Sequence, residues 1–308
     1  MEKIYDLIII GGGPAGLSAG IYGSRSGLRT LLLEKWLIGG LAATTDWLEN
    51  YPGFPDGIKG MDLMDKLKAQ AQRFGAEIMQ AEVKSVKPMT GNIKIETDKK
   101  NYTTATVIVA TGTLPKKLNV PGEDELRGRG VSYCATCDGP LFRDRDIAVI
   151  GCGNSGLQEG HFLLKFAKNI TFVEFLPHMT AEKILQERLK NEPRVQFMLN
   201  HLLVSINGKE RVNSITIRNR VTNQEKMIEV SGVFIYIGFI ALSYFLKGVV
   251  QMDDAGFIMT DKNLTTSVPG IFAAGDIRSK NIRQVVTACA EGAEAAINAH
   301  HYIETLNR

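Results

Sequence analysis

The sequence predicts an α/β protein made of two doubly wound domains, the second inserted into the first. Two apolar strands, Asp6 to Ile10 and Ile147 to Ile150, each run into a glycine-rich loop. Each loop leads into a helix-like segment and then a strand that ends in an acidic residue. This order, repeated in one chain, is typical of Rossmann-like dinucleotide-binding domains. A chain of 308 residues is long enough for two hydrophobic cores.

The first loop is Gly11-Gly12-Gly13-Pro14-Ala15-Gly16, and the strand Thr30 to Leu33 ends at Glu34. Gly11 permits the tight turn, and Gly13 lets the backbone approach a pyrophosphate. Gly16 lets the helix pack closely on the strand, and the start of the helix attracts the phosphate charge. Glu34 is placed to accept hydrogen bonds from a ribose.

The second loop is Gly151-Cys152-Gly153-Asn154-Ser155-Gly156, and its strand, Ile170 to Val173, ends at Glu174. In both copies the acidic residue lies 18 positions after the last glycine. We therefore expect Gly151, Gly153, Gly156 and Glu174 to form a possible second nucleotide site. Cys152 is expected to be a small packed residue rather than a reactive thiol.

The segment Cys134-Ala135-Thr136-Cys137-Asp138-Gly139 carries the most specific chemistry. A Cys-x-x-Cys pair can close a disulfide whose thiolates exchange electrons near neutral pH. Asp138 could hold the proton that this chemistry requires, or it could be an ordinary turn residue. The cysteines could instead be half of a zinc site or inert thiols, but no further ligands have suitable spacing. We predict a redox pair and no metal.

A third signature, Ser267 to Asp276, precedes a helix-like segment that starts at Arg283. By itself this is a strand that ends in a Gly-Asp turn.

The composition excludes other classes of function: a net charge of +3 without a basic block argues against nucleic acid and anionic membranes. The apolar run at the start is too short for a signal peptide or a membrane span. With few cysteines, the protein is expected to be cytoplasmic.

Together with Ala110-Thr111-Gly112 and Arg283-Gln284, these motifs resemble the low-molecular-weight thioredoxin reductase family over essentially the whole chain. The resemblance implies an FAD-binding domain made of residues 1–115 and 243–308. Residues 116–242 would be an inserted domain that carries the redox cysteines, and a domain rotation would bring them alternately to the flavin and to thioredoxin. It also implies a homodimer with thioredoxin as its partner.

The resemblance assigns roles by position. Cys137 would lie nearer the flavin and accept electrons, Cys134 would attack the disulfide of thioredoxin, and Asp138 would donate a proton. The positions implied to bind FAD are Gly11, Gly13, Pro14, Ala15, Gly16, Glu34, Gly40, Asn50, Thr111, Gly112, Gly275, Asp276, Arg283, Gln284 and Val285.

The departures from the family concern the electron donor. NADPH-using relatives have an alanine at Gly156 and a His-Arg-Arg cluster where this chain has Glu174 to His178. The family's Pro-Asn-Thr is replaced within Phe239 to Ser243. A carboxylate about 4 Å from a phosphate costs about 1 to 4 kcal/mol, so NADPH is unlikely. NADH bound by Glu174 and a protein donor such as ferredoxin both stay open.

A different class of function is a flavin-dependent redox sensor or binding module that uses the disulfide as a switch. Catalytic reduction of a thioredoxin-like protein by sub-stoichiometric amounts of the chain separates the enzyme from the sensor.

Overall fold

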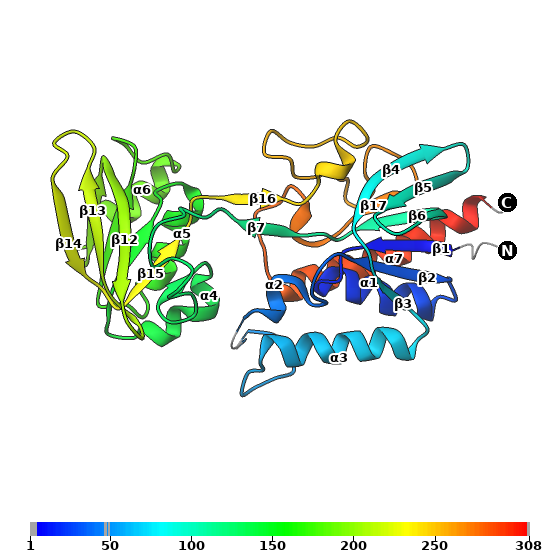
Figure 1. Ribbon diagram of the computed structural model, residues 1–308, viewed down its shortest axis with the longest axis horizontal. Coiled ribbons are helices and arrows are strands. Elements are labelled where there is room, and N and C mark those ends of the chain that lie inside the picture. Colours follow the sequence, from blue (N-terminus) through cyan, green and yellow to red (C-terminus); the bar gives the residue numbers. More distant parts are fainter. Residues whose placement is uncertain (1–4, 46–47, 49, 307–308) are drawn as a thin grey trace. The chain divides into compact units, whose positions relative to one another are not determined.

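The computed structural model describes residues 5–45, 48 and 50–306, and the chain divides into two compact units (Figure 1). Unit 1 combines both ends of the chain, residues 1–114 and 240–308, and unit 2 is Pro115–Phe239 between them. The division lies one residue before the expected boundary at the first crossing and three residues before it at the second.

Unit 1 contains a seven-stranded sheet in the order β3-β2-β1-β6-β5-β4, and β17 also pairs with β6. The strands β1, β2, β3, β6 and β17 run parallel, whereas β4 and β5 are antiparallel additions. The strands are β1 (Tyr5–Ile10), β2 (Thr30–Glu34), β3 (Glu77–Gln80), β4 (Val83–Met89), β5 (Asn92–Thr97), β6 (Asn101–Val109) and β17 (Ile271–Ala273). The helices are α1 (Pro14–Arg25), α2 (Gly40–Ala43), α3 (Gly60–Arg73) and α7 (Val285–Leu306), with the 3-10 helices η2 (Tyr244–Leu246) and η3 (Gly275–Ile277).

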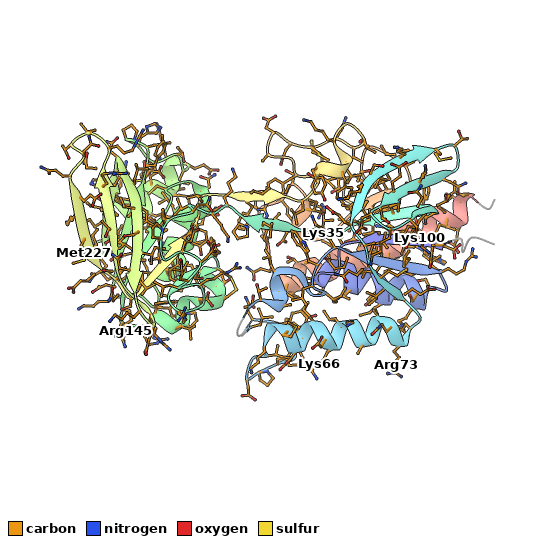
Figure 2. All side chains as sticks on the ribbon, in the orientation of Figure 1. Lys35, Lys66, Arg73, Lys100, Arg145 and Met227 are labelled. Atoms are coloured by element: carbon orange, nitrogen blue, oxygen red, sulfur yellow. A yellow bond between two sulfur atoms is a disulfide. The ribbon has the colours of Figure 1, made fainter. Side chains whose placement is uncertain are left out.

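The core of unit 1 explains why β1 is apolar throughout. Leu7 and Ile9 pack with residues of α1, α3 and α7 on one face of the sheet, and Ile8 and Ile10 pack on the other face. A parallel strand covered on both faces needs apolar side chains in both directions. The outer side of α3 carries charged side chains such as Lys66, which points away from the sheet (Figure 2).

Unit 2 contains a parallel sheet in the order β11-β10-β9-β15-β8 and an antiparallel sheet in the order β12-β13-β14. The strands are β8 (Val131–Ser132), β9 (Asp146–Ile150), β10 (Asn169–Glu174), β11 (Val195–Leu199), β12 (His201–Gly208), β13 (Val212–Asn219), β14 (Glu225–Glu229) and β15 (Gly232–Ile235). The helices are α4 (Ala135–Asp138), α5 (Asn154–Leu163) and α6 (Lys183–Lys190), with the 3-10 helix η1 (Gly139–Phe142).

The core of unit 2 repeats the pattern of unit 1. On β9, Ile147 and Val149 pack against residues of α4, α5 and α6, whereas Ala148 and Ile150 pack against the antiparallel sheet. Each unit is therefore built on a sheet whose parallel strands are covered on both faces. The predicted fold class, two doubly wound domains with the second inserted into the first, is confirmed.

Two short strands, β7 (Thr113–Pro115) and β16 (Phe239–Ala241), pair where the chain passes between the units (Figure 1). The Lys116 amide donates to the Gly238 carbonyl at 2.9 Å. The stretch from Phe239 to Ser243, which stands where the family has Pro-Asn-Thr, therefore begins with the strand β16.

Candidate functional site

The first glycine loop lies between β1 and α1. Gly11 has a φ of +109°, and a Cβ added there would lie 2.4 Å from the Ala110 carbonyl oxygen. A Cβ on Gly16 would lie 1.8 Å from the Gly11 carbonyl oxygen, so both positions require glycine. A Cβ on Gly13 would meet no atom within 4 Å, and one on Gly40 would lie 3.5 Å from the Gly13 Cα. The loop is thus tightly packed at both ends and open at Gly13, where a ligand can approach the backbone.

Glu34, at the end of β2, is held against this loop. Its Oε2 accepts a hydrogen bond from the Gly12 amide at 2.6 Å, and its Oε1 accepts one from the Trp36 amide at 2.8 Å. A carboxylate has about four acceptor positions, so Glu34 keeps capacity for ribose hydroxyls.

The Gly-Asp turn near the end of the chain lies beside the same loop. A Cβ on Gly275 would lie 2.9 Å from the Ala15 Cβ. The next residue, Asp276, has a buried Oδ1 that accepts no hydrogen bond from the described residues, and the Lys280 Nζ is 3.6 Å away. Burial raises the pKa of Asp276, and the Lys280 charge opposes this rise. A buried acceptor without a donor fits a ligand that brings hydroxyl groups, as the ribitol of FAD would.

Sequence reasoning missed the group that holds this turn. The Glu291 Oε2 accepts a hydrogen bond from the Gly275 amide at 2.7 Å. Its Oε1 lies 2.8 Å from the Arg278 Nη1 and 3.0 Å from the Lys280 Nζ. Glu291 is on α7, and no motif in the sequence links it to the turn.

Other predicted FAD residues form separate contacts. The Asn50 Nδ2 donates to the Gln284 Oε1 at 3.1 Å, which joins two predicted residues that lie far apart in the sequence. The Thr111 hydroxyl donates to the Leu242 carbonyl at 2.8 Å, and the Leu242 amide donates to the Gly112 carbonyl at 3.2 Å. Thr111 and Gly112 thus contact the returning chain segment.

The remaining predicted residues lie at the two helices that meet at the first loop. Pro14 is the first residue of α1, and its carbonyl is 3.7 Å from the Cys289 Sγ of α7. Val285 begins α7, and the Arg283 guanidinium lies 4.6 Å from the centre of the Phe257 ring.

The redox segment forms the short helix α4 in unit 2. Cys134 and Cys137 are joined by a disulfide, and both residues are partly exposed. The Ser132 hydroxyl donates to the Asp138 Oδ2 at 2.5 Å and accepts from the Cys134 amide at 3.1 Å. Ser132 therefore links the predicted proton donor to the backbone of a redox cysteine.

The second glycine loop repeats the geometry of the first. A Cβ on Gly151 would lie 2.4 Å from the Tyr236 carbonyl oxygen, and one on Gly156 would lie 2.0 Å from the Gly151 carbonyl oxygen. A Cβ on Gly153 would meet only the Thr180 Oγ1, at 3.5 Å. Gly153 is therefore the more open position of this loop, as Gly13 is in the first.

Glu174 matches Glu34 bond for bond. Its Oε2 accepts from the Cys152 amide at 2.6 Å, and its Oε1 accepts from the Leu176 amide at 3.0 Å. Cys152 is fully buried, and burial raises the pKa of its thiol to about 12, with the Glu174 charge as the second cause. Cys152 is thus a packed residue, as expected.

An arginine contacts Phe175, the residue after Glu174, although the sequence around Glu174 contains none. The Arg220 Nη1 donates to the Phe175 carbonyl at 3.0 Å, and its guanidinium lies 4.0 Å from the centre of the Phe175 ring. Arg220 follows β13, and the antiparallel sheet brings it to the end of β10. Sequence reasoning missed this cation because the two segments come together only in the folded chain.

Three further features lie outside these sites. Over residues 5–45, 48 and 50–306, no group of three or more His, Cys, Asp and Glu side chains is placed to hold a metal ion. Within the same residues, no helix is long and apolar enough to cross a bilayer.

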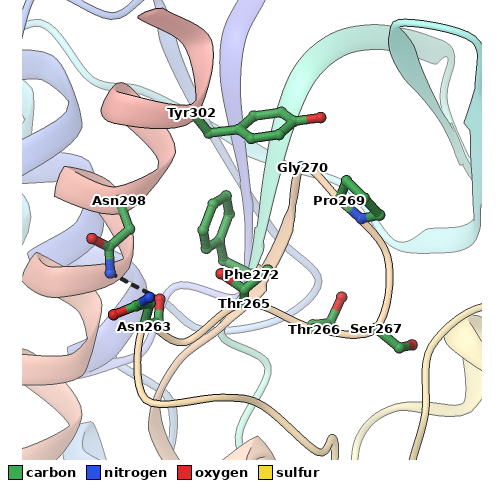
Figure 3. A pocket seen from close by; sticks show the side chains of 9 residues that line it. All are labelled: Asn263, Thr265, Thr266, Ser267, Pro269, Gly270, Phe272, Asn298 and Tyr302. Carbon is green, nitrogen blue, oxygen red and sulfur yellow. Dashed lines mark hydrogen bonds between the residues drawn. The ribbon is translucent and has the colours of Figure 1, made fainter. Parts of the chain in front are cut away.

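A surface cavity of about 380 Å³ lies between the end of α7 and the segment before β17 (Figure 3). None of the predicted site residues lines it.

Comparison with known proteins gives a consistent picture. Residues 5–292 match the model of the pyridine nucleotide-disulphide oxidoreductase family. The chain is 42% identical over 311 residues to a thioredoxin reductase of Peptoclostridium acidaminophilum, covering 99% of this chain and 98% of that one. The crystal structure of thioredoxin reductase from Streptococcus pyogenes superposes with a TM-score of 0.93 at 38% identity, covering 99% and 100% of the two chains. A ferredoxin-flavin thioredoxin reductase from Clostridium acetobutylicum superposes with a TM-score of 0.53 at 27% identity, covering 98% and 99%.

Proposed function

The chain belongs to the pyridine nucleotide-disulphide oxidoreductase family as a flavoprotein of the low-molecular-weight thioredoxin reductase type, and from this premise we propose that it passes electrons from NADH through FAD to thioredoxin. The observation that carries the proposal is the Cys134–Cys137 disulfide, which lies in the same unit as a second dinucleotide-type loop. By resemblance to the family, we also propose a homodimer.

Unit 1 is the proposed FAD-binding unit. The Gly11 to Gly16 loop would bind the pyrophosphate at the start of α1, and Glu34 would bind the adenosine ribose. Asp276, whose buried Oδ1 accepts no hydrogen bond, would accept one from the ribitol. When bound, FAD supplies the electron pair that reduces the disulfide.

The residues of unit 2 would carry out the disulfide chemistry. Breaking the Cys134–Cys137 bond with two electrons produces two sulfur anions, and each becomes a thiol when it takes up a proton. Asp138 is the proposed first donor because it directly follows Cys137 and its carboxylate is linked through Ser132 to the Cys134 amide. Cys134, as a thiolate, would then attack the disulfide of thioredoxin.

Glu174 supports NADH as the donor. Its carboxylate is held by two backbone amides, as the carboxylate of Glu34 is, and it keeps acceptor capacity for the 2'-hydroxyl of a ribose. A phosphate at that position would meet the same fixed negative charge. Arg220 offsets part of this repulsion, but its hydrogen bond to the Phe175 carbonyl and its stacking on the Phe175 ring hold the guanidinium there.

The test is an anaerobic comparison of three donors. The purified holoenzyme is mixed with NADH, NADPH or photoreduced ferredoxin, and flavin bleaching and reduction of added thioredoxin are followed together. We expect NADH to bleach the flavin fastest. Bleaching by ferredoxin alone would contradict the NADH proposal and make the second loop a structural remnant. Failure of sub-stoichiometric enzyme to turn over thioredoxin with any donor would favour the redox sensor instead.

A further inference from the structure

A buried tyrosine hydroxyl lies beneath the redox helix. Tyr236 follows β15 and belongs to the same hydrophobic cluster as Ala135 of α4 and Leu157 of α5. Within the described part of the chain, its hydroxyl is buried and makes no hydrogen bond. Buried polar groups without a partner are rare, and they often mark an ordered water or a catalytic role.

Three polar groups affect the pKa of this hydroxyl. Burial raises the pKa of Tyr236 well above its ordinary value, and the carboxylates of Glu159 and Asp138 raise it further, whereas the Ala135 backbone amide lowers it. Tyr236 thus packs with residues of α4 and α5, and its hydroxyl is affected by a carboxylate from each of these two helices.

Helix geometry explains why Glu159 lies there. A Cβ on Gly156 would lie 3.8 Å from the Tyr236 Cβ, so Tyr236 packs on α5 at this turn. Glu159 is three residues later and therefore on the same face of the helix. Glu159 is only partly exposed, and burial raises the pKa of its carboxyl. It is thus a carboxyl group that the fold favours in its protonated form.

The other ionisable groups near α5 are neutral, already hydrogen-bonded or exposed. Cys152 is a neutral thiol, and both oxygens of Glu174 accept backbone hydrogen bonds. Asp146, at the far end of β9, already accepts a hydrogen bond from Asn169. The others on α5 and on the adjacent α6 are exposed side chains: His161, Lys183, Glu187, Arg188 and Lys190.

We propose that Glu159 is a proton reservoir for the redox disulfide and that the Tyr236 hydroxyl passes its proton to Asp138. The inference rests on the proposed disulfide chemistry. Reduction of the Cys134–Cys137 bond to two thiols consumes two protons, but Asp138 can supply only one before it must be reprotonated.

Each transfer is balanced. The Glu159 carboxyl gives its proton to the Tyr236 oxygen while the Tyr236 hydroxyl proton moves to the Asp138 carboxylate. Glu159, which is partly exposed, then regains a proton from water. The net change is one proton moved from solvent to Asp138, and no electron is transferred in this step. A water molecule can bridge any two of these groups that are too far apart for a direct hydrogen bond.

The test is the pH profile of thioredoxin reduction by the holoenzyme, measured for Glu159→Gln and Tyr236→Phe. Both substitutions keep the shape of the side chain and remove its transferable proton. We expect both variants to match the unmodified enzyme at acidic pH and to turn over about tenfold more slowly at alkaline pH, where free protons are scarce. The matched controls are Tyr133→Phe, which removes a hydroxyl from the residue before Cys134 that donates to Glu123 instead, and Glu187→Gln, which removes an exposed carboxyl. Both controls should keep the unmodified profile.

Profiles of E159Q and Y236F that run parallel to that of the unmodified enzyme would overturn the proposal, as would an equal alkaline loss in Y133F. A second readout does not depend on turnover. Infrared difference spectra between the unmodified protein and E159Q, recorded after a phosphine has reduced the disulfide, should contain a carboxylic acid band, and Y236F should keep that band. The absence of this band from the unmodified protein would also refute the proposal. If the enzyme fails to reduce thioredoxin, the infrared result still tests Glu159 separately from the proposed function.

Discussion

Replacement of Glu174 by alanine should change which nicotinamide cofactor the enzyme uses. A hydrogen bond to a charged group contributes about 1.5 to 3 kcal/mol, so loss of the carboxylate should lower kcat/KM for NADH by about ten- to a hundredfold. Removal of the like charge should raise kcat/KM for NADPH by at least about fivefold, from a repulsion of about 1 to 4 kcal/mol at about 4 Å. The ratio of the two should therefore fall by about fiftyfold or more.

The substitution also affects stability, because the Cys152 and Leu176 amides lose their acceptor. The cost should be about 2 kcal/mol, since Glu174 is only 8% exposed and its place is poorly open to water. Glu174→Gln keeps one acceptor oxygen and should retain more of the stability while losing the charge. Thermal unfolding measured beside the kinetics separates these two effects.

Steady-state rates of thioredoxin reduction with each cofactor provide the assay. Glu187→Ala, an exposed change on α6 of the same unit, is the control and should leave both kcat/KM values unchanged. An NADH to NADPH ratio that is the same in E174A and in the unmodified enzyme would refute the reasoning, since the Glu174 carboxylate would then contact neither ribose.

Four other substitutions test the remaining roles. Cys134→Ser should keep the flavin spectrum and abolish thioredoxin reduction, and full turnover by this variant would contradict the disulfide mechanism. Gly16→Ala should prevent FAD binding because its Cβ would lie 1.8 Å from the Gly11 carbonyl oxygen. Gly13→Ala meets no atom within 4 Å, so it should leave the Tm of the FAD-free protein nearly unchanged but weaken FAD binding, as fluorescence titration would measure. Burial raises the pKa of Asp276 above 3.8, so its stabilising contribution is present below pH 3.8 and is lost as the pH rises through the raised value. Asp276→Asn should therefore raise the Tm of the FAD-free protein at pH 7, lose that gain below pH 3.8, and weaken FAD binding.

Local patterns predicted the geometry of the two glycine loops. Gly11 and Gly16 were singled out for a tight turn and for close packing, and an added Cβ would collide at both positions. The strand expected at Asp6 to Ile10 is β1 (Tyr5–Ile10), and the one expected at Ile147 to Ile150 is β9 (Asp146–Ile150). These features were predictable because a loop, its strand and its helix interact within one short stretch of chain.

Contacts between distant segments were not predictable. Arg220 comes to Phe175 only because β13 pairs in a separate sheet that packs on the parallel one. Glu291 holds Gly275 from α7, and Tyr236 faces α4 from the end of β15. In each case the side chain has no partner at helix or strand spacing, so a single sequence carries no signal for it.

The matching hydrogen bonds of Glu34 and Glu174 bear on whether the second glycine loop binds a nucleotide or is only a structural remnant. Each carboxylate bonds one amide of its glycine loop and one amide two residues beyond itself, so each is fixed at the same place relative to the start of its helix. These bonds would satisfy a carboxylate that only holds the loop in place, but a carboxylate has about four acceptor positions, so Glu34 and Glu174 both keep acceptor positions for further donors. In unit 1 the proposed FAD ribose fills them. In the proposed function, the same geometry in unit 2 would accept a hydrogen bond from a ribose hydroxyl of NADH, whereas a 2'-phosphate would meet the fixed negative charge.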